Sequence, residues 1–168
     1  MFLKSYVEIP TQFDVVRAAV EREPLSWLEG LAVEAEREGE SLLVDVGLSL
    51  AGRSLRRPAD LQVGEPQVGS AVASLPIRLR VHGSQRLLPS FYGSLDAAWL
   101  GARRTQLALS LQYEPPLGLL GKAIDRTLLH RVAESVAQNF LAGAARRLEE
   151  RTYGGAAKES ASRNLAVE

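Results

Sequence analysis

The sequence predicts an α+β domain in which an antiparallel sheet is covered by one long C-terminal helix. Polar and apolar residues alternate with a period of two through most of residues 41–114. This is typical of strands that have one solvent-exposed (wet) face and one buried (dry) face. After this region, apolar residues recur at every fourth position, which is typical of a helix; they are Leu120, Ile124, Leu128, Val132, Val136, Phe140, Ala144 and Leu148.

The N-terminal residues predict one strand followed by two short helices. Residues 2–9 (FLKSYVEI) alternate in polarity and end at Pro10, as a strand should. Thr11 occupies the position of a helix N-cap, and the apolar residues that follow it share one helical face. Pro24 ends this helix and can occupy the first turn of a second one, which ends at Gly39.

Residues 41–114 predict a meander of antiparallel strands. We expect the strands at residues 42–50, 61–65, 71–81, 91–99 and 105–113. In all of them except the weaker segment 61–65, one register is aliphatic or aromatic apart from Gly93, Thr105 and Tyr113. This register is expected to face a dry interior. The opposite register is expected to face water and includes Asp45, Arg78, Arg80, His82, Asp96, Gln106 and Gln112.

The apolar stripe near the C-terminus predicts a helix from about Leu119 to Glu150. Each step of four residues advances the stripe by roughly 40° around the axis, so the stripe winds along the helix. At ~1.5 Å per residue the helix is roughly 45 Å long, enough to cross the whole sheet. Residues 152–168 show little periodicity, so we expect a domain at residues 1–151 and a flexible C-terminal tail.

Composition narrows the functional class. The 168 residues suit one domain, and the absence of Cys excludes disulfides, thiolate catalysis and Cys-ligated zinc. Two His residues do not suffice for a metal site, and no cofactor is expected. Twenty basic and 20 acidic residues give no net charge to attract nucleic acid. No apolar run suits a membrane span and no signal peptide is evident, so the predicted location is cytoplasmic.

Residues 115–122 (PPLGLLGK) look like a phosphate-binding loop but do not match one. Such a loop needs a glycine five positions before Gly121 and a hydroxyl residue after Lys122. Pro116 and Ala123 occupy these two positions. We interpret the segment as the turn that leads into the long helix.

The order of these elements, with a last strand and helix that read YEPPLGLLGKAIDRTLLHRVAE, resembles the START-like superfamily. This superfamily is also called SRPBCC or polyketide cyclase/lipid-transport proteins. The resemblance covers residues 2 to about 150. It implies a helix-grip fold, in which a curved sheet wraps around the C-terminal helix and encloses a largely apolar cavity. Members include lipid and sterol carriers and aromatic polyketide cyclases, so the fold does not by itself specify an activity.

The dry register provides the candidate ligand-binding residues. Tyr113 is its one titratable member, and Asp125 falls within the dry stripe of the helix, where it also suits the helix start. His82 and His130 project away from the dry side. We assign no catalytic residue. The residues expected to line the cavity are Trp27, Val46, Leu48, Leu75, Ile77, Leu79, Phe91, Leu95, Trp99, Leu109, Leu111, Tyr113, Ile124, Asp125, Leu128 and Val132.

Three functions follow from this arrangement. The first is the binding or carriage of a hydrophobic small molecule, such as a lipid, a prenyl compound or an aromatic metabolite, without catalysis. The second is an enzyme of the polyketide cyclase or aromatase type, in which Tyr113, Thr105 or Asp125 polarises a carbonyl group. The third is a fully packed interaction or scaffold domain, which a pocket well below ~300 Å³ would favour. The sequence leaves the oligomeric state open.

Overall fold

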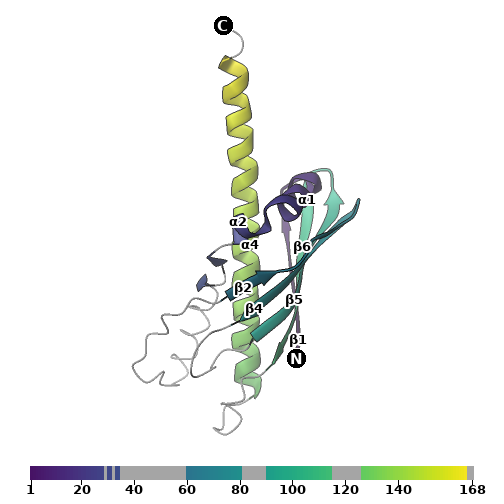
Figure 1. The fold of residues 1–168 in the computed structure, drawn as a ribbon, viewed down its shortest axis with the longest axis vertical. Coiled ribbons are helices and arrows are strands. Elements are labelled where there is room, and N and C mark those ends of the chain that lie inside the picture. The colour runs from purple at the N-terminus through teal and green to yellow at the C-terminus, as the bar shows by residue number, and fades with distance from the viewer. Residues whose placement is uncertain (29, 32, 35–59, 81–89, 115–125, 166–168) are drawn as a thin grey trace, which may run out of the picture.

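The computed structural model describes residues 1–28, 30–31, 33–34, 60–80, 90–114 and 126–165 (Figure 1). The predicted α+β class is confirmed. The predicted strand at residues 42–50 lies outside the described residues. The elements are β1 (Phe2–Ile9), α1 (Phe13–Arg22), α2 (Pro24–Leu28), β2 (Asp60–Val63), β3 (Gln67–Val68), β4 (Val72–Arg80), β5 (Ser90–Gly101), β6 (Arg104–Glu114) and α4 (Arg126–Leu165).

The strands form one antiparallel sheet in the order β1-β6-β5-β4-β2, with β3 also paired to β4. Consecutive strands β4, β5 and β6 are neighbours, as the meander prediction requires. The first strand pairs with the last, from Phe2 opposite Gln112 to Ile9 opposite Thr105. Among the described residues, no helix is long and apolar enough to cross a membrane.

The predicted register is confirmed along most of the sheet. Alternate residues of β4, β5 and β6 are buried on the inner face, whereas Arg78 and Arg80 on the other register are exposed. Asp96 lies on the outer register, where its carboxylate accepts hydrogen bonds from the hydroxyls of Ser74 and Ser94. The buried members are Ala73, Leu75, Ile77, Leu79, Phe91, Leu95, Ala97, Thr105, Leu107, Leu109, Leu111 and Tyr113.

The middle of the sheet requires a glycine where β5 crosses β6. Gly93 lies opposite Leu111, and a Cβ atom added to it would overlap the carbonyl oxygen of Ser110. Any larger residue would therefore push the two backbones apart. The missing side chain explains the one gap in the apolar register of this strand.

Helix α1 covers one end of the inner face, and α2 packs against α1 and α4. Helix α1 packs over β4, β5 and β6 through Phe13, Val16 and Val20. The predicted N-cap is wrong by one residue, because Gln12 caps α1 without a side-chain hydrogen bond. Thr11 is instead buried, and its carbonyl accepts a hydrogen bond from the Thr105 hydroxyl.

Helix α4 packs mainly over β1 and β6, at the other side of the inner face. Its buried residues Val132, Val136, Phe140, Ala144 and Leu148 recur at every fourth position, so the predicted stripe is confirmed over this range. The predicted helix end near residue 150 is wrong, because α4 continues to Leu165 and extends past the sheet (Figure 1). The apolar stripe of the sequence ends at Leu148, before the helix does. The flexibility assigned to residues 152–168 stays a prediction.

Candidate functional site

Among the described residues, hydrocarbon side chains line the space between the sheet and α4. A void of about 10 Å³ lies there, and we call its lining the interior seam. This volume is about the minimum that one water molecule needs. No side chain of the seam carries a polar group, so the described residues of the seam offer a ligand only apolar contacts. The seam consists of Leu61, Ile77, Leu79, Phe91, Leu111, Val136, Ala137 and Phe140.

The structure buries most of the residues that we expected to line a cavity. Val46, Leu48, Ile124 and Asp125 lie outside the described residues, and for Leu128 only the helical backbone of α4 is described. Of the remainder, Ile77, Leu79, Phe91 and Leu111 line the seam, whereas Trp99 is 59% exposed. That the others line a ligand cavity stays a prediction. The buried residues are Trp27, Leu75, Ile77, Leu79, Phe91, Leu95, Leu109, Leu111, Tyr113 and Val132.

Trp27 is buried for a reason that the sequence pattern of its short helix does not show. Its indole Nε1 donates a hydrogen bond to the carbonyl of Ala19 in α1, at 3.1 Å. The bond satisfies the polar end of the ring inside the core. Trp27 therefore fixes α2 against α1, which is a structural role, and it does not line the seam.

A tyrosine and a histidine meet near one end of the seam. The Tyr113 hydroxyl lies 3.0 Å from His130 Nδ1, and their ring centroids are 6.2 Å apart. The Tyr113 hydroxyl also contacts Met1 Sδ, and the Tyr113 ring packs against Phe91 of the seam. The pair thus unites a buried phenol with a half-buried imidazole, and each of these side-chain types can serve as a general acid or base.

The prediction that His130 projects away from the dry side is wrong. His130 lies three, seven and eleven residues before Ala133, Ala137 and Leu141, and all three are buried. These spacings place four residues on one flank of α4 beside the main stripe. Alanine is only weakly apolar. The sequence pattern therefore showed the stripe of larger apolar residues at every fourth position and did not show this second flank.

A larger hollow lies outside the core, between α1 and α4. Its volume is about 360 Å³, and its lining includes Arg22, Glu23 and Arg151. None of the predicted cavity residues lines this hollow. Within the described ranges, no three His, Asp or Glu side chains gather in a way that would hold a metal ion.

Comparisons with known proteins add the following findings. No family model matches the chain, and no curated protein matches it. Three solved structures show the level of similarity. A conserved protein from Geobacillus kaustophilus has a TM-score of 0.47 and 12% identity, over 89% of this chain and 96% of that one. A START superfamily protein from Mycobacterium smegmatis has a TM-score of 0.44 and 14% identity, over 89% and 95%.

The third solved structure is the Zhui aromatase/cyclase from Streptomyces sp. R1128. It has a TM-score of 0.38 and 15% identity, over 90% of this chain and 95% of that one. The fold is START-like. This follows from the order of the elements in the chain itself, in which β1 pairs with β6, two short helices follow β1 and α4 packs on the inner face. At these identities the START-like fold says nothing about the activity.

Proposed function

We propose that the chain binds a small hydrophobic molecule, such as a lipid, a prenyl compound or an aromatic metabolite, between the sheet and α4. The observation that supports this most is the interior seam, where hydrocarbon side chains from four strands and α4 surround one void. Ligand sites in proteins are concave and mainly apolar. A ligand that removes roughly 300 Å² of apolar surface from water gains about 7 kcal/mol before association costs of several kcal/mol.

The void of about 10 Å³ adds a condition to this proposal. A site for a drug-sized ligand has at least ~300 Å³, so the described side chains must part before one can enter. The seam is the place where they would part, because no hydrogen bond joins its eight side chains across the void. Binding should therefore change the packing of Val136, Ala137 and Phe140 of α4 against the sheet.

The small void also favours a second candidate, a packed domain that acts through its surface and holds no ligand. A third candidate, an enzyme of the polyketide cyclase type, gains support from the Tyr113–His130 contact. It would need the pair to reach a substrate carbonyl from the seam, and Tyr113 is now only 1% exposed. The cytoplasmic location and the absence of a nucleic-acid partner stay predictions.

Native mass spectrometry and organic extraction of the purified protein test the first candidate directly, and a fluorescent fatty acid serves as a probe of the apoprotein. Ala137→Leu should fill the seam and weaken probe binding at least tenfold, because the added carbons would occupy the void. Ala142→Leu is the matched control, since Ala142 lies exposed on the same helix. Thermal unfolding of both variants verifies that they fold.

The outcomes separate the candidates. A bound apolar species, or probe binding that Ala137→Leu alone weakens, supports a ligand site at the seam. If no apolar species is extracted and the probe does not bind, the packed domain is the better description. If the probe binds equally to both variants, it binds elsewhere and the seam is not the site.

A further inference from the structure

Four large apolar side chains are exposed at the same end of the sheet, on its two faces, and we call them the tip patch. Val68 is 39% exposed, Val72 50%, Trp99 59% and Leu100 41%. They come from the ends of β3, β4 and β5. Val68 and Trp99 belong to the inner register, whereas Val72 belongs to the outer one, so the tip patch occupies both faces of the sheet at this end. Val72 lies opposite Ala98, Val68 lies opposite Ala73, and Trp99 donates its backbone N–H to the Ala71 carbonyl. Several large apolar side chains exposed at one end of a domain make that end a candidate interaction surface.

The local backbone presents the tip patch outward. The β5–β6 pairing shifts register between Trp99 and Gly101, which leaves Leu100 outside the ladder. Such a bulge bends a strand and re-aims its side chains. The turn to β6 follows at once, so Trp99 and Leu100 lie beside the end of a hairpin. The end of a hairpin is convex. A convex end can insert into a deformable surface such as a lipid bilayer, but it does not enclose a small ligand.

Positive charge accompanies the tip patch. Arg103 is exposed in the hairpin turn, and it has no ion-pair partner among the described residues. Arg104 beside it is bonded to Glu8, at 2.7 Å. Since Glu8 already neutralises Arg104, the charge of Arg103 is left to attract an anion.

We propose that the tip patch inserts into the interface of an anionic lipid bilayer. Trp prefers the boundary between hydrocarbon and headgroups, where its ring is buried and its N–H stays wet. Leu100, Val68 and Val72 add apolar surface at the same end of the sheet, so an end-on approach can bury both faces, and Arg103 can reach lipid phosphates. A second copy of the chain fits less well, because a two-fold contact through this tip would place two Arg103 side chains close together. The proposal does not depend on a ligand at the interior seam.

The two tryptophans of the chain provide an internal comparison for the test. Trp99 is 59% exposed at the tip, whereas Trp27 is 2% exposed in the core. The full chain is mixed with vesicles of phosphatidylcholine alone or with phosphatidylglycerol, some of them with brominated acyl chains that quench nearby indole rings. Co-sedimentation measures binding. Quenching in the wild type and in Trp99→Phe shows which indole contacts the acyl chains.

We expect binding to vesicles that contain phosphatidylglycerol, with quenching that Trp99→Phe abolishes while co-sedimentation is largely kept. The double variant Trp99→Ser, Leu100→Ser should lose at least about tenfold in binding, because it removes most of the inserted apolar surface. Arg103→Gln should weaken binding about fivefold at low salt and less at high salt. Tyr6→Ser is the control, since Tyr6 is 71% exposed but lies on β1, away from the tip.

Several results would overturn the proposal. One is no co-sedimentation with anionic vesicles. Another is binding that Tyr6→Ser weakens as much as the double variant does. A third is a Trp99 emission that changes with protein concentration and not with lipid, because the tip would then cover a second copy of the chain. Thermal unfolding of every variant verifies that a loss of binding is not a loss of fold.

Discussion

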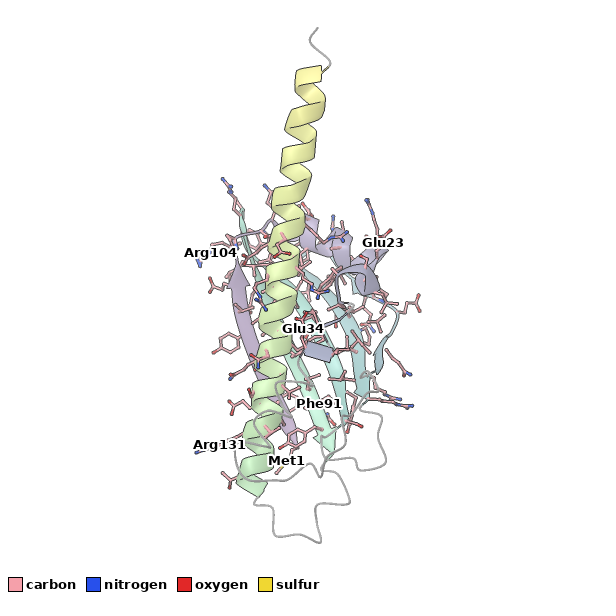
Figure 2. All side chains as sticks on the ribbon, turned by 90° about the vertical axis from the view of Figure 1, so that its left-hand side faces the viewer. Met1, Glu23, Glu34, Phe91, Arg104 and Arg131 are labelled. Carbon is pink, nitrogen blue, oxygen red and sulfur yellow. The ribbon has the colours of Figure 1, made fainter. Side chains whose placement is uncertain are left out.

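The two ends of β5 have the same sequence pattern and different surroundings. Phe91 near its start and Trp99 near its end both belong to the inner register, yet Phe91 is 1% exposed and Trp99 is 59% exposed. Figure 2 shows Phe91 and Met1 toward one end of the sheet and Arg104 toward the other. At the Phe91 end, the ring packs on Tyr113, which contacts His130 of α4. At the Trp99 end, the tip of the sheet extends beyond the elements that cover its inner face.

The partners of these residues on β6 show where the cover ends. Phe91 lies opposite Tyr113, and both are buried. Trp99 lies opposite Thr105, which is fully buried because the chain at Thr11 covers it. The boundary between core and surface therefore runs between Trp99 and Thr105. Alternation defines the face of a strand, whereas the helices decide how much of that face is buried.

The largest effect should come from truncating the aromatic side chain at each end. Phe91→Ala should lower the free energy of unfolding by about 3–5 kcal/mol, because it leaves a cavity in the core. Trp99→Ala should change it by less than about 1 kcal/mol, since most of that ring already contacts water. Urea unfolding of both variants measures the difference. Equal costs would mean that the tip is as well covered as the seam.

A second comparison uses the two glycines of the same strand. Gly93→Ala should cost about 2–3 kcal/mol, because its Cβ would overlap the Ser110 carbonyl and the strands must separate. Gly101→Ala should cost well under about 1 kcal/mol, since nothing lies within 4 Å of the added atom. Thermal unfolding of the pair is the measurement. A harmless Gly93→Ala would contradict the close approach of β5 and β6.

Substitution of the two threonines near the Trp99 end by valine should change the free energy of unfolding differently at the two positions. Thr105→Val removes the hydrogen bond to the Thr11 carbonyl and leaves that buried acceptor unpaired, at a cost of about 1–2 kcal/mol. Thr11→Val should be neutral or stabilise by up to about 1 kcal/mol, because the buried Thr11 hydroxyl has no hydrogen-bond partner among the described residues. Urea unfolding distinguishes the two signs. A destabilised Thr11→Val would reveal a partner for that hydroxyl.

The smallest effect concerns the polar pair at the Phe91 end. Tyr113→Phe should lower the free energy of unfolding by about 1 kcal/mol, because it removes the hydroxyl next to His130 Nδ1. The half-buried imidazole can then bond to water, which limits the loss. Tyr92→Phe on the outer face is the control. In an NMR spectrum of the imidazole nitrogens, only Tyr113→Phe should shift the His130 signals.

Local pattern was enough to predict most of the fold. The strands β1, β4, β5 and β6 and the stripe of α4 were predicted because side-chain direction has a fixed period in each kind of element. The register of the sheet followed for the same reason, down to the exposure of Arg78 and Arg80. The buried part of the candidate site followed with it, including Ile77, Leu79 and Phe91 of the seam, since these positions belong to one register.

Contacts between distant segments decided the rest. The Tyr113–His130 contact joins β6 to α4, and the alanine flank that places His130 there is a weak signal in one sequence. The exposure of Trp99 depends on where α1 and Thr11 stop covering the sheet, which the pattern of β5 does not contain. Periodicity is a property of each element alone. Burial also depends on the elements that pack on a face, so only the tertiary structure could assign the limits of the core, the polar pair and the tip.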